Sequence, residues 1–94
     1  MELQFEWDED KARINQITHK VSFDEGATIF HDLFIATRPD PIHSEEEQRS
    51  ISIGFSIKGR LLVVVYTERS DRTRVISCRK ATPTERKTYA KHKH

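Results

Sequence analysis

Two basic side chains stand at the end of an expected strand, immediately before the start of an expected helix. Residues 72–79 favour a strand, and Arg79 and Lys80 lie at its end. The segment TPTE at 82–85 then supplies an N-cap, a proline at N1 and an acidic N3 residue, which predicts a helix start. Backbone N–H groups at a helix start favour anions, and the planar arginine fork can bind two phosphate oxygens at once. The pattern is typical of a phosphate site, although a solvated strand end is the simpler interpretation of these residues alone.

Tyr89 lies four residues after Glu85, so both side chains project from one face of the expected helix. A tyrosine there could stack on a nucleic-acid base or donate a hydrogen bond to a phosphate. The alternative is a solvated basic helix in which the Tyr89 ring packs on the sheet. The residues alone favour that alternative.

The remaining candidates for chemistry lie in loops and at strand ends. Glu68 is a candidate general base, or it holds an arginine in place, or it forms only a surface ion pair. His43 could transfer protons near neutral pH, although a loop histidine is more often only solvated. Strand alternation does not choose among four arginines that flank the expected strands, namely Arg60, Arg69, Arg72 and Arg74.

The sequence offers no support for metal, nucleotide or thiol chemistry. The histidines show no metal-ligand spacing with Cys78 or with each other. The three glycines form neither a P-loop nor a dinucleotide-binding motif. No histidine base is placed beside Cys78, so a nucleophilic cysteine is not expected. We therefore expect neither a metal nor a cofactor.

Charge is divided unevenly along the 94 residues, a length that suits a single domain over residues 1–94. Residues 1–47 carry 12 Asp or Glu and 4 Lys or Arg, whereas residues 48–94 carry 3 Asp or Glu and 12 Lys or Arg. The basic half predicts a nucleic-acid or other anionic partner, unless the two halves simply attract each other within the fold. The lone Cys78, the absence of a signal-peptide pattern and the shortness of the longest apolar run predict a cytoplasmic protein without a membrane span.

The elements that position these residues follow from hydrophobic periodicity and capping signals. In chain order we expect a strand at 3–7, a helix from an Asp8 cap to about His19, a helix beginning at Ser22, a loop at 38–41, strands at 51–57, 61–67 and 72–79, and a helix from Thr82. The strand at 61–67 is apolar throughout, which predicts a central position. The fold class is α+β, an antiparallel meander packed against helices in the order β-α-α-β-β-β-α.

Periodicity also predicts which faces are buried. The first helix is expected to bury Ala12 or Ile14 together with Ile17, and the second carries an apolar stripe of Phe23, Ala27, Phe30 and Phe34. In the strand at 51–57 the isoleucines and Phe55 alternate with serines and glycine, which predicts one buried face. Along the last strand, simple alternation places Val75, Ser77 and Arg79 on one face and Arg74, Ile76, Cys78 and Lys80 on the other.

Several stretches taken together resemble the BrnT toxin family. They are, in chain order, Phe5-Glu6-Trp7-Asp8, Lys11-Ala12, Asn15, His19, Val21-Ser22-Phe23, His43-Ser44, Gly59-Arg60, Thr67-Glu68-Arg69, Arg79-Lys80-Ala81-Thr82, Glu85-Arg86 and Tyr89. The resemblance implies a RelE-like fold and the toxin of a type II toxin–antitoxin pair, which cleaves RNA and stops translation. It also implies a BrnA-type antitoxin with a ribbon-helix-helix DNA-binding domain, and binding of operator DNA through that antitoxin.

The resemblance also suggests roles for individual residues in a metal-independent endoribonuclease. Arg79, then Arg69 and Lys80, would stabilise phosphate charge, Glu68 and His43 would transfer protons, and Tyr89 would contact a base or phosphate. Further RNA contacts would come from Arg60, Arg74, Lys11 and Arg86, and Glu47 is a weaker candidate. The alternatives are a non-catalytic toxin that only binds the antitoxin and co-represses its operon, and a structural domain without a nucleic-acid role.

Two positions depart from the family pattern. Lys20 stands where the family commonly has a glycine that ends a helix, so Lys20 must take a strained conformation or the helix must end otherwise. Cys78 stands where a small residue such as alanine is usual. We expect Cys78 to be a tolerated small, partly buried residue, not a new catalytic group.

Overall fold

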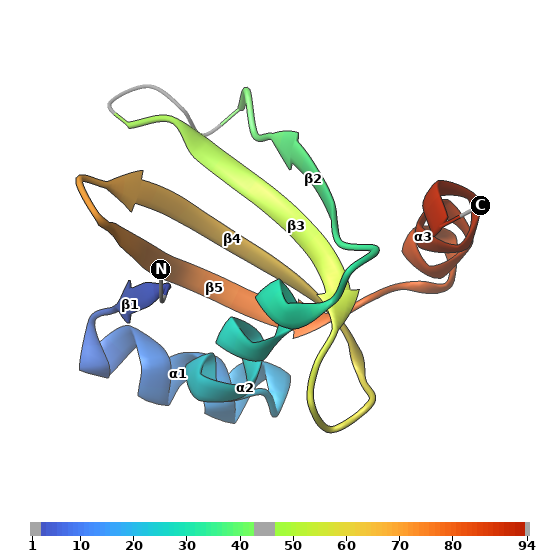
Figure 1. The fold of residues 1–94 in the computed structure, drawn as a ribbon. Helices are drawn as coiled ribbons and strands as arrows, with labels where there is room; N and C mark the ends of the chain where they lie inside the picture. The colour runs from blue at the N-terminus through green and yellow to red at the C-terminus, as the bar shows by residue number, and fades with distance from the viewer. Residues whose placement is uncertain (1–2, 43–46, 94) are drawn as a thin grey trace.

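The computed structural model describes residues 3–42 and 47–93, which form one five-stranded sheet with helices on both faces (Figure 1). In chain order the elements are β1 (Gln4–Glu6), α1 (Glu9–His19), α2 (Phe23–Ala27), the 3-10 helix η1 (Thr28–His31), β2 (Ala36–Pro39), β3 (Arg49–Phe55), β4 (Leu61–Arg69), β5 (Arg72–Lys80) and α3 (Pro83–Lys93). The α+β class is therefore confirmed.

The sheet is mixed, which corrects the prediction of an antiparallel meander. Its strand order is β1-β5-β4-β3-β2, and β1 pairs parallel with β5 while the other neighbours are antiparallel. The strand β2 was also missed, because the prolines at 39 and 41 favoured a loop. Pro39 fits in β2 because an edge strand leaves one side of the backbone unpaired.

The apolar strand β4 lies at the centre of the sheet, as its sequence predicts. Its even-numbered side chains join the larger core beneath α1, α2 and η1, which is built on Val21, Phe23, Ile29, Leu62, Val64, Tyr66, Val75 and Cys78. Its odd-numbered side chains Leu61 and Val63 join a smaller cluster with Ile53 and Tyr89. The helix α3 therefore packs on the opposite face, at one end of the sheet (Figure 1).

The helix α1 begins at the predicted Asp8 cap, whose side chain accepts hydrogen bonds from two backbone N–H groups. Its predicted apolar face is confirmed for Ala12, which packs against the larger core, and is wrong for Ile14 and Ile17, which are 59% and 67% exposed. Asn15 is buried instead. The Asn15 side-chain amide donates to the carbonyls of Val21 and Cys78, and its oxygen accepts from the Cys78 N–H. A buried amide that is satisfied in this way replaces apolar packing at the helix–sheet contact.

The helix that begins at Ser22 is shorter than its apolar stripe predicts. Ser22 caps it by accepting a hydrogen bond from the Glu25 N–H, but α2 gives way to η1, which ends at His31. Asp32 then accepts hydrogen bonds from the N–H groups of Phe34 and Phe55, which turns the chain toward β2. Phe34 is consequently 45% exposed and lies outside the larger core.

The structure shows how the two positions that depart from the family pattern are accommodated. Lys20 takes the left-handed conformation at φ 59° and caps α1, so the strained geometry is adopted without glycine. A Cβ on Gly26 would lie 3.1 Å from the Cys78 sulfur, so the two residues pack as a close pair. Burial raises the pKa of the Cys78 thiol to about 11, which suits a packing residue and not a nucleophile.

Candidate functional site

A β-bulge in β5 brings Arg74 and Arg79 to the same face of the sheet. Val65 pairs with Ser77 but Tyr66 pairs with Val75, so Ile76 is the extra residue. On one side of the bulge Arg79 lies opposite Val63, and on the other side Arg74 lies opposite Thr67. Val63 and Thr67 lie on the same face of β4, so Arg74 and Arg79 do too. The prediction from simple alternation, which separated the two arginines, is therefore wrong.

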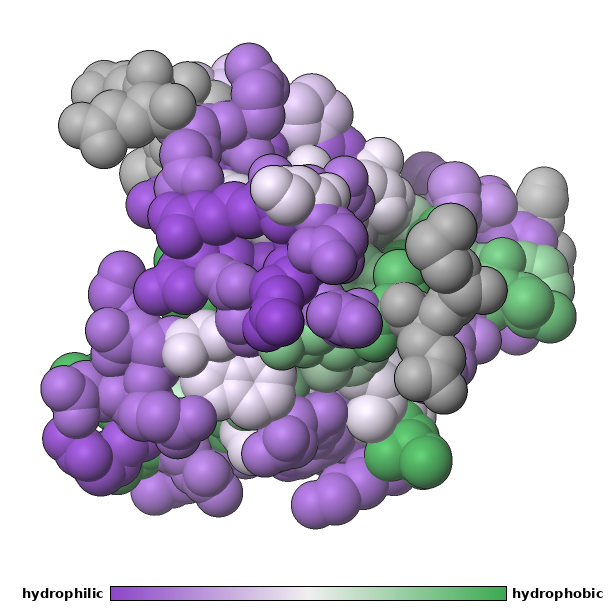
Figure 2. Space-filling view, turned by 60° about the vertical axis from the view of Figure 1, so that its left-hand side comes forward, coloured by the Kyte–Doolittle hydropathy of each residue, from purple (hydrophilic) through white to green (hydrophobic). Residues whose placement is uncertain are grey.

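Arginines from four strands share this face of the sheet, on the side away from α1 and α2. By register they are Arg38 of β2, Arg49 of β3, Arg69 of β4, and Arg72, Arg74 and Arg79 of β5, and we call this surface the arginine face. Arg69 and Arg72 are direct cross-strand partners. Like charges placed directly opposite each other destabilise a sheet, so folding alone does not favour this arrangement. Hydrophilic residues also cover most of the surface seen in Figure 2.

Arg79 is held by a bidentate ion pair with Glu85 of α3. Its two terminal nitrogens donate to the two Glu85 carboxylate oxygens at 2.7 and 2.9 Å, and Nη1 also donates to the Lys80 carbonyl at 3.3 Å. The hydrogen bonds from Arg79 lower the pKa of Glu85 to about 2, so the pair stays charged at neutral pH. A guanidinium has five N–H donors, so Arg79 keeps donors for a further anion.

Two further arginines of the face are held in the same way by carboxylates. Arg69 donates from Nε and Nη2 to Glu47 at 2.8 and 2.7 Å, and these hydrogen bonds lower the pKa of Glu47. Arg74 donates from Nη1 to Glu6 of β1 at 2.9 Å. The parallel pairing of β1 with β5, which the sequence did not predict, places Glu6 beside Arg74.

A buried hydroxyl lies between two of these arginines. In the ladder, Thr67 of β4 is flanked by Arg49 of β3 and Arg74 of β5. Thr67 is 2% exposed, and its Oγ1 has no hydrogen-bond partner within the part of the chain that the structure describes. Such a group normally finds a partner in protein or water, so Thr67 is a candidate site residue that the sequence did not indicate. Its only sequence signal is a polar residue in an otherwise apolar central strand.

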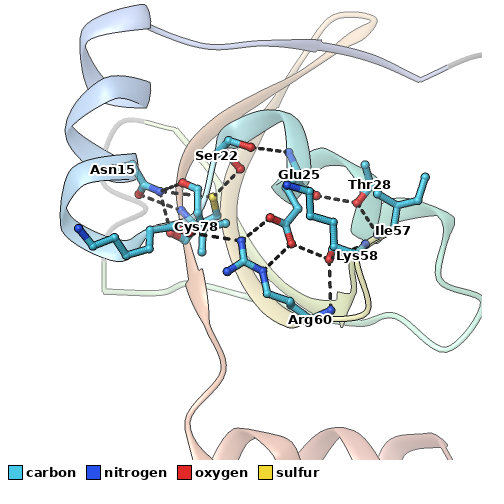
Figure 3. A network of polar contacts seen from close by, with 11 residues as sticks. Asn15, Ser22, Glu25, Thr28, Ile57, Lys58, Arg60 and Cys78 are labelled. Carbon is cyan, nitrogen blue, oxygen red and sulfur yellow. Dashed lines mark hydrogen bonds and ion pairs between the residues drawn. The ribbon is translucent and has the colours of Figure 1, made fainter.

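Arg60, predicted to contact RNA, belongs instead to a network beneath the sheet (Figure 3). Its guanidinium forms an ion pair with Glu25 through two nitrogens, and it also donates to the Lys20 carbonyl at 3.3 Å. The Glu25 side chain is only 2% exposed and also accepts a hydrogen bond from Ser56 at 2.7 Å. The hydrogen bonds from Arg60 lower the pKa of Glu25, which keeps this carboxylate charged.

Tyr89 anchors α3 to the sheet. Its side chain is buried, its hydroxyl donates to Asp32 at 2.6 Å, and its ring packs edge-on against Phe55. Burial, together with the hydrogen bond to Asp32, raises the pKa of Tyr89 to about 12. This is the arrangement in which the ring packs on the sheet, the alternative that the residues alone favoured.

The other predicted site residues are scattered. Lys80 and Glu68 are exposed, and strand alternation directs both side chains to the face opposite Arg79 and Arg69. Lys11 is exposed on α1, and Arg86 is exposed on α3. His43 lies outside the described residues. The structure therefore places Arg69, Arg74 and Arg79 on one face of the sheet and directs Lys80 and Glu68 to the other.

The described residues contain neither a group of metal ligands nor a membrane-spanning helix. Among residues 3–42 and 47–93, no three His, Cys, Asp or Glu side chains are grouped as metal ligands would be. No helix within the same residues is both long enough and apolar enough to cross a membrane.

Comparison with known proteins relates the chain to one family and to a solved structure. The family described as "Ribonuclease toxin, BrnT, of type II toxin-antitoxin system" matches residues 7–85. The fold is similar to the crystal structure of the Brucella abortus ribonuclease toxin BrnT, with a TM-score of 0.63 and 20% sequence identity over 86% of this chain and 99% of that chain. No curated protein matches the sequence.

Proposed function

The chain belongs to the BrnT family of ribonuclease toxins of type II toxin–antitoxin systems, and we propose that it cleaves RNA on the arginine face without a metal ion. The observation that carries this proposal is the gathering of six guanidinium groups on one side of the sheet. An RNA backbone is a chain of phosphates, and arginine is the side chain best suited to bind them.

The carboxylates of the face support this assignment, because they orient the arginines without using all their donors. Glu85, Glu47 and Glu6 each hold one guanidinium, so three rotamer-rich side chains are positioned before any RNA arrives. Preorganised donors that already point to developing charge need no rearrangement during reaction. We propose that the Thr67 hydroxyl adds a neutral donor between Arg49 and Arg74 once a phosphate displaces the arginine stems.

In the proposed reaction a ribose 2′-oxygen attacks the adjacent phosphorus. The O2′–P bond forms and the P–O5′ bond breaks, while a base takes the 2′ proton and an acid protonates the O5′ leaving group. Arg79 stabilises the negative charge that develops on the oxygens of the attacked phosphate. Arg69 lies six residues along β4 from Val63, the partner of Arg79, so it stabilises the charge of another phosphate of the same RNA. Of the two proton-transfer residues proposed from the sequence, Glu68 projects to the opposite face. We propose His43, which lies outside the described residues, as the remaining candidate. Tyr89 positions α3, and through it Glu85 and Arg79.

We also propose a role for this cleavage in the cell. RNA cleavage would inhibit translation and growth, and a BrnA-type antitoxin with a ribbon-helix-helix domain would neutralise the toxin. Toxin and antitoxin together would repress their own operon by binding its operator DNA. The rival proposal is a non-catalytic toxin that retains only the antitoxin and operator roles.

The test is cleavage of single-stranded RNA by the purified chain in EDTA, for wild type, Arg79→Ala and Arg13→Ala. Arg13 is a matched control because it also pairs with a carboxylate, Asp10, but on the exposed side of α1. We expect Arg79→Ala to lose about 100-fold in rate, as for removal of one oxyanion donor, with Arg13→Ala unchanged. Full cleavage by a folded Arg79→Ala variant would exclude the site. No cleavage by wild type would favour the non-catalytic rival.

A further inference from the structure

An apolar groove lies at the end of the sheet where η1, the β3–β4 hairpin and α3 meet. It has a volume of about 430 Å³, and Leu33, Phe34, Phe55 and Ile57 line it. Leu33 is 93% exposed and Ile57 is 82% exposed, while Phe34 and Phe55 are about half-exposed. Apolar side chains gathered in a groove at the surface mark an interaction site more often than scattered ones do.

The rim of this groove is basic. The Lys93 ammonium stands 5.2 Å from the centre of the Phe34 ring, and Lys58 follows Ile57 in the hairpin turn. Two carboxylates of the described residues also contact groove residues, and both keep their negative charge. Asp32 accepts hydrogen bonds from Phe34, Phe55 and Tyr89, and Glu25 is paired with Arg60.

We propose that this groove is the docking site for a segment of the antitoxin that carries aliphatic side chains flanked by carboxylates. The aliphatic side chains would fill the groove, and the carboxylates would meet Lys58 and Lys93. A second copy of this chain fits less well, because a two-fold interface would bring two copies of the same lysine-rimmed patch together. This inference rests on the proposed membership of a toxin–antitoxin pair, but it does not depend on RNA cleavage.

The test measures binding of the purified protein encoded by the gene adjacent to that of this chain. The variant is Leu33→Ser with Ile57→Ser, two highly exposed residues whose loss leaves both cores intact. We expect the Kd to rise about tenfold or more, as for loss of central apolar anchors, with RNA cleavage by the free toxin unchanged. Lys58→Glu with Lys93→Glu should also weaken binding, and should remove part of its salt dependence.

The matched control is Ile14→Ser with Ile17→Ser, which removes a comparable apolar pair that is exposed on α1. The control should bind within about threefold of wild type, because it lies outside the groove. Unchanged binding by the groove variant, equal weakening by the control, or no binding by wild type would overturn the proposal. Sedimentation of the chain alone tests whether a second copy occupies the groove instead. A dimer of the wild-type chain that is lost in the Leu33→Ser with Ile57→Ser variant would assign the groove to a second copy and overturn the proposal.

Discussion

Two helices of this protein begin with the same motif, yet their glutamates have different partners and surroundings. Ser22 and Thr82 each cap a helix by accepting a hydrogen bond from the backbone N–H of the glutamate three residues later. Glu85 reaches back to the Thr82 N–H and also holds Arg79 on the arginine face. Glu25 instead points into the fold, where Arg60 and Ser56 satisfy it.

Burial accounts for the different roles of the Glu25–Arg60 pair and the Glu85–Arg79 pair. The Glu25 side chain is 2% exposed, whereas the Glu85 side chain is 21% exposed and its partner Arg79 is 41% exposed. Removing one partner of a buried pair leaves an uncompensated charge in the interior, while an exposed pair contributes little to stability. The first pair therefore holds the fold together, and the second leaves an arginine accessible to a ligand.

The largest effect is expected from Arg60→Ala. This change leaves the Glu25 carboxylate buried, with Ser56 as its one remaining side-chain partner among the described residues. The thermal midpoint should therefore fall by about 10 °C or more. The measurement is thermal unfolding followed by circular dichroism.

Arg13→Ala is the control for Arg60→Ala, because its ion pair with Asp10 is highly exposed and its loss should leave the midpoint nearly unchanged. A similar thermal midpoint for Arg60→Ala and Arg79→Ala would show that the buried pair and the exposed pair contribute equally to stability, which would contradict the difference in their roles.

A smaller effect is expected in the salt dependence of RNA binding. Each phosphate contact to a single strand contributes about −0.7 to the slope of log K against log salt. Arg79→Ala should reduce the magnitude of the slope by about that amount, whereas Arg13→Ala should leave it unchanged. The measurement is titration of the two folded variants with a 2′-deoxy-substituted RNA that cannot be cleaved. An unchanged slope for Arg79→Ala would remove Arg79 from the phosphate contacts.

The smallest effect concerns acid stability. The pKa of Glu85 lies at about 2 in the folded protein against an ordinary value of 4.5, so the unfolded chain binds more protons between these values. The stabilisation by Glu85 is therefore present above about pH 4.5 and is lost as the pH falls toward 2, with a magnitude of at most about 1 kcal/mol for a partly exposed pair.

Urea unfolding of wild type and Glu85→Gln from pH 2 to pH 6 tests this linkage. The difference in free energy of unfolding should be small at the acid end and should grow as the pH rises through the window. A difference that does not change with pH would mean that Glu85 stabilises the protein only as a helix cap.

Local signals predicted much of the fold. The caps at Asp8, Ser22 and Thr82, the central strand and the packing role of Cys78 are confirmed, because each depends on neighbouring residues or on composition. The family resemblance is confirmed as well, while the RelE-like classification stays a prediction.

The arrangement of the site depended on contacts that are distant in sequence. Ile76 carries no glycine or proline signal that would mark a bulge, yet this one extra residue decides that Arg74 joins Arg79. The pairing of β1 with β5 and the insertion of Asn15 beneath β5 likewise depend on tertiary contacts. For the same reason, no local pattern could distinguish Arg60, which binds Glu25, from the arginines of the open face.

The central claim is that RNA binds to the arginine face and not to the other arginines. The most direct measurement is NMR of the arginine Nε–Hε groups during titration with the 2′-deoxy-substituted RNA. We expect RNA to change the chemical shifts of four arginines of the face and to leave those of Arg13 and Arg60 in place. The four are Arg69, Arg72, Arg74 and Arg79. Shifts confined to Arg13 or Arg60, with the face unaffected, would contradict this claim.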